Sequence, residues 1–460
     1  MKSVALHNLG CKVNGYEMDV MQQMLQEKGY KIVPFDEQAD IYIVNTCTVT
    51  NIADRKSRQM LHRAKKRNPG SIVVAVGCYV QAGGEEALKD EGIDLAIGNN
   101  KKKDLAEILE KYLAGKEESG IEGKGEDGKN GQEKAGCAYS RKTLQHTTII
   151  DIGKTSEFEE MRLTETSGHA RAYIKIQDGC NQFCSYCIIP YARGRVRSRK
   201  QEDILEEVRG LAANGYKEVV LTGIHISSYG VDKGKPALLG LLKEIHGIEG
   251  VERIRLGSLE PRIVTQEFAL ELRRLPKLCP HFHLSLQSGC DATLKRMNRH
   301  YTTGEYYEKV KMLRKVFENP AITADIIVGF PGETEEEFQE TKEFLEKIKF
   351  YEMHVFKYSR RKGTPAAVME HQVPEETKAS RSNLLLSMEK IHSKEYRESF
   401  LGQEEEVLFE DEKEIGKECY QVGHTKQYVK AAKKSEKSLS NTIMTGKITK
   451  FLLDDIMLLQ

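Results

Sequence analysis

The sequence contains no apolar run that approaches the roughly 20 residues needed to span a bilayer. Its first residues lack the basic and then long apolar pattern of a signal peptide. It also has almost no net charge, because 70 lysines and arginines face 69 aspartates and glutamates. We therefore expect a cytoplasmic protein without membrane contact, in which any contact with nucleic acid depends on local patches rather than on a global field.

No internal repeat occurs at a solenoid period. A chain of 460 residues is too long for one ordinary domain, and about three units are expected. Because the cytoplasm is reducing, we do not expect the ten cysteines to form a disulfide framework. Metal ligation, catalysis and plain burial remain as their uses, and their positions have to decide among these.

The first 115 residues alternate β-rich runs with amphipathic helices, which predicts a parallel-sheet βαβ domain of the α/β class. Strands are expected at 3–7, 41–44 and 72–76, and helices at 16–28, 54–66, 85–89 and 104–113. Residues 116–165 are predicted to be a polar linker or insertion, since 116–134 is a mixture of Gly, Lys and Glu with almost no apolar content.

The alternation returns in a central domain predicted at 166–396. Strands are expected at 172–176, 218–221, 253–256, 283–286, 322–328 and 354–356, with helical stretches between them. This order predicts a (βα)6 partial TIM-like barrel, with every loop that follows a strand on one face. The last region, 397–460, has short β-prone runs at 406–409, 428–431, 442–448 and 455–459, which predict a small β-barrel.

Three cysteines at C-x3-C-x2-C spacing follow the first strand of the central domain: Cys180, Cys184 and Cys187. Three thiolates so close together can hold a cubic [4Fe–4S] cluster and leave its fourth iron open to another ligand. The alternatives are an incomplete zinc site or three buried thiols, although zinc prefers four ligands in paired spacing.

This segment resembles the radical S-adenosylmethionine (SAM) superfamily. The resemblance implies that the open iron chelates the amino and carboxylate groups of SAM. It also implies that one electron from the cluster cleaves the sulfonium to a 5′-deoxyadenosyl radical, which abstracts an unactivated hydrogen. Cys180, Cys184 and Cys187 would then be the catalytic cluster ligands.

Three further cysteines, Cys11, Cys47 and Cys78, each lie just past a predicted strand of the first domain. Parallel strands bring such positions to one edge, where open α/β sheets bind ligands, so these thiols are candidates to hold a second [4Fe–4S] cluster. The alternative is three small buried residues before helix starts.

Two three-cysteine sites followed by a small β-barrel resemble the layout of the methylthiotransferase family over nearly the whole chain. The likeness lapses from residue 116 to about 162, where this chain is longer and more polar than the family pattern. Within the family, the segments 9–14, 45–50 and 193–199 are similar to the branch that modifies N6-threonylcarbamoyladenosine at position 37, next to the anticodon in tRNA.

The resemblance also assigns SAM-binding residues at strand ends. Tyr186 is expected to stack on the adenine, with loop packing as the alternative; the other candidates are Thr222, Gly223, Ser258, Glu260, Val328 and Gly329. A structural ion pair is the alternative for Glu260. The superfamily's Gly-Gly-Glu appears here as residues 221–225 without its glutamate, so the ligand of the SAM amine is not identified.

Arg193, Arg195, Arg197 and Arg199 recur at period two, so an extended chain would aim all four guanidinium groups the same way, as a stripe for phosphates. A solvated basic face is the alternative. In the last domain His424 and Tyr428 resemble the family's RNA-docking TRAM barrel, and nearby lysines are compatible with RNA contact. Gln287 and Ser288 match family positions, whereas Cys137, Cys279, Cys290 and Cys419 have no ligand spacing.

The resemblance implies that the radical removes hydrogen from C2 of the adenine, that the N-terminal cluster delivers sulfur and that a second SAM supplies the methyl group. The expected cofactors are two [4Fe–4S] clusters and two SAM per product, and the expected partners are a tRNA anticodon stem-loop and an external one-electron reductant. No stable protein partner is inferred. The rivals are a methylthiotransferase acting on isopentenyladenosine or a ribosomal protein, and a non-catalytic iron–sulfur RNA-binding or redox-sensing protein.

Overall fold

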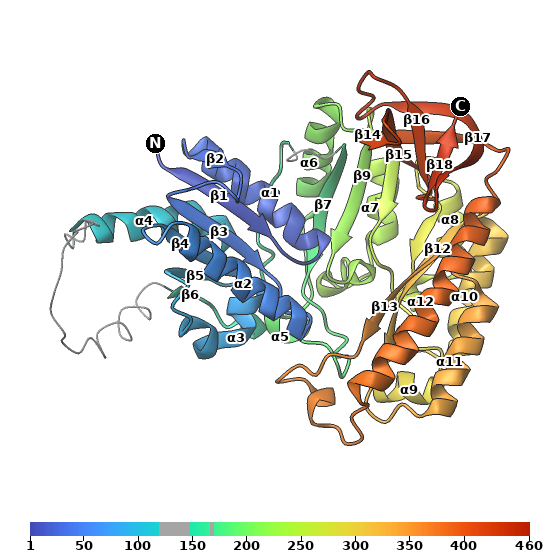
Figure 1. Cartoon of the computed structure of the whole chain (residues 1–460), viewed down its shortest axis with the longest axis horizontal. Coiled ribbons are helices and arrows are strands. Elements are labelled where there is room, and N and C mark those ends of the chain that lie inside the picture. Colours follow the sequence, from blue (N-terminus) through green and yellow to red (C-terminus); the bar gives the residue numbers. More distant parts are fainter. Residues whose placement is uncertain (119–146, 166–169) are drawn as a thin grey trace. The chain divides into compact units, whose positions relative to one another are not determined.

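The computed structural model describes residues 1–118, 147–165 and 170–460. The chain divides into two compact units (Figure 1). Unit 1 comprises Met1–Leu163, Asp178–Asn181 and Cys187–Arg197, and unit 2 comprises Thr164–Gln177, Gln182–Tyr186 and Ser198–Gln460. Within the described residues, no helix combines the length and the apolar character needed to cross a membrane. Most of the predicted polar linker, including Cys137, lies outside the described residues.

Unit 1 is built on a six-stranded sheet in the order β2-β1-β3-β4-β5-β6, in which all the pairings are parallel. Its strands are β1 (Ser3–Asn8), β2 (Lys31–Val33), β3 (Ile41–Thr46), β4 (Ile72–Gly77), β5 (Leu95–Ile97) and β6 (Thr147–Thr148). Its helices are α1 (Lys12–Glu27), α2 (Asn51–Arg67), α3 (Cys78–Leu88), α4 (Leu105–Glu118) and α5 (Ile189–Arg193).

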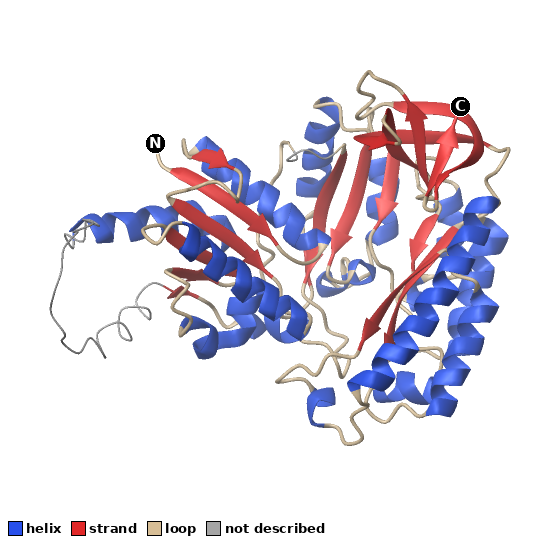
Figure 2. Ribbon diagram, in the orientation of Figure 1, coloured by secondary structure: helices blue, strands red, loops and turns tan. Residues whose placement is uncertain are grey.

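Every residue of β3 and β4 is buried, as expected for parallel strands covered on both faces. Figure 2 shows the helices (blue) packed alongside these strands (red). Helix α2 illustrates why the segment is helical: the Thr50 side chain caps it by accepting from Ala53, and Lys65, Lys66 and Arg67 lie in its last turn, where cations are favoured. The predicted parallel-sheet domain is confirmed.

Unit 2 contains the predicted partial barrel, which is also confirmed. A four-stranded sheet (β10-β9-β7-β8) and a three-stranded sheet (β11-β12-β13) are linked by isolated bridges such as Leu259↔Leu284. The strands are β7 (Arg171–Asp178), β8 (Arg197–Ser198), β9 (Glu218–Gly223), β10 (Arg253–Leu256), β11 (His281–His283), β12 (Ala321–Val328) and β13 (Glu352–Lys357). The fourth barrel strand ends at His283, where the sequence predicts 283–286, because the later residues pair only through such bridges.

The helices of this barrel are α6 (Gln201–Ala213), α7 (Leu238–His246), α8 (Gln266–Arg273), α9 (Asp291–Arg296), α10 (Thr303–Val316), α11 (Glu335–Ile348) and α12 (Glu375–Glu398). Reciprocal capping boxes start α10 at Thr302 and Glu305, and α11 at Thr334 and Glu337. The strands and helices enclose one large apolar core.

The chain ends in a small closed barrel, as predicted, in the order β14-β15-β16-β18-β17. Its strands are β14 (Glu404–Ile415), β15 (Glu418–Thr425), β16 (Lys430–Lys434), β17 (Ile443–Leu453) and β18 (Ile456–Leu459). β15 is not among the runs that the sequence predicts as strands, yet it pairs with β14 over most of its length.

Candidate functional site

Three cysteines of unit 1 lie at neighbouring strand ends. Cys11 is the N-cap of α1 just after β1, Cys47 directly follows β3, and Cys78 begins α3 directly after β4. Because β1, β3 and β4 are adjacent and parallel, their carboxyl ends reach one edge of the sheet. The fold of this unit therefore gathers three thiols that are far apart in the sequence.

The thiols are close enough to interact. A Cβ on Gly10, whose φ is +110°, would lie 3.1 Å from Cys47 Sγ, so the loop that carries Cys11 passes directly over Cys47. Burial raises the pKa of Cys47 to about 11, and the thiols of Cys78 and Cys11 add to the rise. A thiol must lose its proton to bind iron, and the positive charge of a bound cluster would lower the pKa again.

A buried polar network supports this edge. Arg193 Nη1 donates to Glu17 Oε1 at 2.8 Å and Nη2 donates to Asn14 Oδ1 at 2.6 Å. Lys102 also pairs with Glu17, and both side chains are almost fully buried. Asn99 Nδ2 lies 3.4 Å from Cys78 Sγ. The sheet edge that carries the three cysteines is thus lined by cations and amides that are themselves held by hydrogen bonds. Neither the composition nor the spacing of the sequence could predict this network.

The arginine-rich segment is mostly buried. Arg193 belongs to the network above, Arg197 Nη2 lies 3.8 Å from Asp178 Oδ2, and Arg199 pairs with Glu207. Arg195 is exposed. The predicted stripe of four exposed guanidinium groups is therefore wrong for three of them: α5 ends at Arg193, so the chain is not extended there, and buried carboxylates take up the charges.

The second cysteine set lies on the loop after β7. The start of the loop is tightly turned, since Gly179 has φ +71° and a Cβ there would meet the Arg195 carbonyl oxygen at 1.8 Å. Cys180 N–H donates to the Gly194 carbonyl at 3.0 Å. Cys180 and Cys187 belong to unit 1 and are partly buried, while Cys184 belongs to unit 2 and is buried.

The part of the loop in unit 2 is anchored at the end of α9. Ser185 N–H donates to the Met297 carbonyl at 3.0 Å, and Asn298 Nδ2 donates to the Phe183 carbonyl at 3.0 Å. Arg299 Nη1 donates to Cys184 Sγ at 3.2 Å. Arg299 is a functional candidate that sequence reasoning missed, because more than a hundred residues separate it from the thiol it contacts.

The residues predicted to lie near the adenine, Tyr186, Val328 and Gly329, each pack against other parts of unit 2. Tyr186 is half-buried and meets Phe330 edge-on, with ring centroids 6.5 Å apart. Val328 is buried at the end of β12. Gly329 has φ +69°, and a Cβ there would lie 2.2 Å from Lys378 Cγ. Glycine is therefore required at this position because the side chain of Lys378, on α12 of the same unit, packs directly against it.

The strand end at Thr222 and Gly223 carries a second missed candidate. Thr222 is buried, and Gly223 packs against Gln177. His225 follows them: its N–H donates to Gln177 Oε1 at 2.7 Å, and its Nδ1 lies 2.6 Å from Ser228 Oγ. Burial lowers the pKa of His225 to about 4, with smaller contributions from nearby arginines. A neutral imidazole therefore stands in the segment that lacks the expected glutamate.

The remaining predicted polar residues differ in exposure. Ser258 is exposed, whereas Glu260 is buried and its Oε1 accepts from Arg262 Nε at 2.7 Å. Gln287 is nearly buried in a left-handed conformation with φ +76°. Ser288 is fully buried, with its Oγ 3.2 Å from Thr341 Oγ1. Ser258 is thus the member of this group that lies open to a ligand.

His424 and Tyr428 are partly buried where the small barrel packs against the starts of the barrel strands in unit 2. The Tyr428 ring stacks on His281 and on His424, with centroid separations of 4.9 and 4.3 Å. Arg255 lies over the same ring at 4.8 Å, and Arg171 donates to its hydroxyl at 3.1 Å. Because these side chains already pack on the Tyr428 ring, the arrangement does not support its stacking on a base of the RNA.

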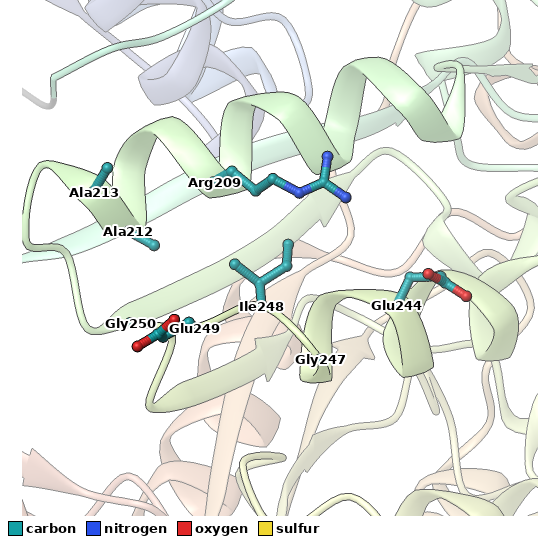
Figure 3. A pocket seen from close by; sticks show the side chains of 8 residues that line it. All are labelled: Arg209, Ala212, Ala213, Glu244, Gly247, Ile248, Glu249 and Gly250. Carbon is teal, nitrogen blue, oxygen red and sulfur yellow. The ribbon is translucent and has the colours of Figure 1, made fainter.

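Three cysteines of the described residues lie outside both sets. Cys279 and Cys290 are buried and Cys419 is partly buried. Burial raises the pKa of Cys279 to about 11, which keeps it a neutral thiol. A surface depression of unit 2 (Figure 3) lies at the ends of α6 and α7 that precede β9 and β10. It contains none of the predicted site residues.

Two protein-family profiles match this chain. The profile of the radical SAM superfamily matches residues 174–345, and that of the uncharacterized protein family UPF0004 matches residues 3–98. Threonylcarbamoyladenosine tRNA methylthiotransferase MtaB of Bacillus subtilis is 39% identical over 98% of this chain and 94% of its own length. tRNA-2-methylthio-N(6)-dimethylallyladenosine synthase of Acetivibrio thermocellus is 36% identical over 89% of this chain and 81% of its own length.

Among solved structures, the radical S-adenosylmethionine methyltransferase TsrM from Kitasatospora setae is similar, with a TM-score of 0.54. The alignment covers 80% of this chain and 74% of that one at 16% identity. At this identity the likeness concerns the fold alone.

Proposed function

Because the chain belongs to the radical SAM methylthiotransferase family, we propose that it adds a methylthio group to N6-threonylcarbamoyladenosine at position 37 of tRNA. The observation that carries this proposal is the gathering of Cys11, Cys47 and Cys78 at one sheet edge, in a chain that also has the radical SAM cysteine motif. Hydrogen abstraction by the radical does not itself require this second set of thiols, whereas sulfur transfer requires a site that holds sulfur.

The substrate assignment rests on relatives. MtaB of Bacillus subtilis matches nearly the whole chain at 39% identity, and the dimethylallyladenosine synthase matches less of it at 36%. The small gap between the two identities makes the substrate the part of the proposal that most needs a direct assay.

Each cysteine set fits an iron–sulfur cluster with three thiolate ligands, and we propose two [4Fe–4S] clusters and two SAM per product. Cys180, Cys184 and Cys187 would hold the radical SAM cluster, which would supply the electron for reductive cleavage of SAM. Arg299 donates to the Cys184 sulfur and so orients that ligand and offsets its negative charge. Ser258, which is exposed at the end of β10, is positioned to bind a polar group of SAM.

We further propose that tRNA phosphates contact Arg195 and lysines of the C-terminal barrel. Arg195, Lys430 and Lys434 are exposed. Lys430 and Lys434 form surface ion pairs with Asp455 at 2.8 Å and Glu418 at 2.6 Å. Such exposed pairs stabilise little, so a phosphate can replace the carboxylate at small cost.

The test is mass spectrometry of nucleosides in tRNA from a host that lacks the modification, with parallel measurement of 5′-deoxyadenosine from SAM under anaerobic, reducing conditions. The intact chain should produce the methylthio derivative of threonylcarbamoyladenosine. Cys180→Ala should abolish both signals, whereas Cys47→Ala should abolish the methylthio product and retain 5′-deoxyadenosine. Cys419→Ser, which removes a thiol outside both sets, should leave both unchanged.

The alternatives give different results. The methylthio derivative of isopentenyladenosine as the product would overturn the substrate assignment and keep the chemistry. Turnover of SAM without any tRNA product would direct attention to protein substrates. The absence of 5′-deoxyadenosine from protein with both clusters loaded would favour the non-catalytic iron–sulfur protein.

A further inference from the structure

Three polar side chains that the proposed reaction does not use meet on the second sheet of unit 2. His283 on β11, Asp325 on β12 and His354 on β13 each offer one ligand atom, and these atoms lie within 4.8 Å of one another. Two imidazoles and one carboxylate form a common ligand set for zinc and for other divalent transition metals.

Strand register places the three on one face. His283 pairs with Thr323, and His354 pairs with Asp325, two residues further along β12. Residues opposite each other, and residues two apart, share a face of a sheet. Ala324 and Ile326, the residues on either side of Asp325, belong to the apolar core, so the three polar side chains occupy the other face of the sheet.

The orientation of His283 is fixed from behind. Its Nδ1 lies 3.0 Å from Thr323 Oγ1, which leaves Nε2 directed at the group. A polar partner on the far nitrogen is the arrangement that commonly orients a metal-binding histidine. Thr323 is itself buried, so this contact is shielded from water.

The facing atoms are close but are not hydrogen-bonded. His283 Nε2 is buried and 3.2 Å from Asp325 Oδ2, yet no hydrogen bond satisfies it. Two ligand atoms about 2.1 Å from one tetrahedral ion are about 3.4 Å apart. The separation therefore matches two ligands that converge on a shared ion. His354 is exposed, and its ring centroid is 5.9 Å from that of His283.

We propose that His283, Asp325 and His354 bind one divalent transition-metal ion, with at least one coordination position open to water or another oxygen ligand. The site is distinct from both cysteine sets, and the proposal holds whichever nucleoside the enzyme modifies.

The experiment uses the full chain with both clusters reconstituted, so that iron and sulfide occupy the thiols. The protein is equilibrated with ZnCl2 and desalted, and zinc, iron and sulfide are counted per chain. Zinc X-ray absorption then identifies the ligands. We expect one zinc per chain with only nitrogen and oxygen neighbours at about 2.0–2.2 Å.

Asp325→Asn and His354→Gln should each abolish zinc retention. Thr323→Val should lower the affinity for zinc about 10–100-fold, as loss of an orienting partner does. The matched control is His62→Gln, which removes an exposed imidazole 2.7 Å from the Asp90 carboxylate and should change nothing. Iron content and circular dichroism identify a variant that fails to fold, and the exposed His354 is the position where folding is least at risk.

Three results would overturn the proposal: no zinc retained by the cluster-loaded wild type, sulfur among the zinc neighbours, or full zinc retention in the folded His354→Gln and Asp325→Asn variants.

Discussion

Arg299 donates a hydrogen bond from Nη1 to the sulfur of Cys184 at 3.2 Å. The guanidinium group is held from the other side by Tyr301, whose hydroxyl accepts from Arg299 Nε at 3.0 Å and donates to the Ser285 carbonyl at 2.6 Å. A fixed cation beside a cluster ligand stabilises the reduced, more negative state of the cluster more than the oxidised one. The reduction potential of the cluster should therefore depend on this side chain.

The first prediction concerns Arg299→Gln. Loss of about 1.5 kcal/mol of differential stabilisation corresponds to a potential about 60 mV more negative for a one-electron couple. Potentiometric titration followed by electron paramagnetic resonance measures the shift, on a variant in which Cys47→Ala removes the second cluster. Arg274→Gln, at an exposed arginine paired with Glu271, should leave the potential unchanged. An unshifted potential in folded, iron-loaded Arg299→Gln would show that the contact has no electronic role.

The second prediction concerns Gly329. The Gly329→Ala variant should destabilise the protein by more than 1 kcal/mol, because φ is +69° and the added methyl group would lie 2.2 Å from Lys378 Cγ. Left-handed backbone alone costs a non-glycine residue about 1–2 kcal/mol. In a double-mutant cycle with Lys378→Ala, the clash should be relieved and the backbone cost should remain. Denaturant unfolding measures the cycle; strict additivity would contradict the steric account.

Part of this architecture is readable in the sequence because it follows from local periodicity. The apolar runs of β3 and β4 predict buried parallel strands, and three cysteines placed just after such strands predict their convergence. β15 was missed because its residues, 418–425, carry little apolar alternation; it is a strand because β14 and β16 supply its hydrogen bonds. Whether a segment pairs with another strand depends on residues elsewhere in the sequence, so local periodicity alone does not predict it.

The prediction for the arginine-rich segment was wrong for the same reason, because its contacts are not local. Its period of two predicts an extended, exposed stripe, but α5 includes Arg193, and Glu17, which is 176 positions earlier in the sequence, takes up that charge inside unit 1. His225, Arg299 and the group around Asp325 were also missed, since a single histidine, arginine or aspartate carries no spacing signal until the fold supplies its neighbours.

The third prediction concerns pH. The pKa of His225 is lowered to about 4 by burial, so between pH 6.5 and 4 the unfolded chain binds a proton that the folded chain does not. Stability from this group is present at neutral pH and is lost as the pH falls through that window, by about 1.4 kcal/mol at pH 5.5. Urea unfolding at pH 7.5 and 5.5 should show a smaller loss for His225→Gln than for wild type. His62→Gln is the control, and equal losses in all three proteins would contradict the assignment.

The fourth prediction separates two roles for Tyr428. If the ring holds the small barrel in place, Tyr428→Ala should cost about 3 kcal/mol of stability, whereas Tyr428→Phe, which loses only the bond from Arg171, should cost about 1 kcal/mol.

The affinity for tRNA decides between the roles. If Tyr428 instead stacked on a base, its removal would cost about 1–3 kcal/mol of binding, which is more than about fivefold. We expect folded Tyr428→Ala, measured at low temperature, to bind tRNA within twofold of wild type. Lys430→Ala together with Lys434→Ala should reduce the salt dependence of binding, because these exposed amines are the groups free to exchange a surface carboxylate for a phosphate. Strongly weakened tRNA binding by a folded Tyr428→Ala variant would instead indicate that the Tyr428 ring contacts the RNA.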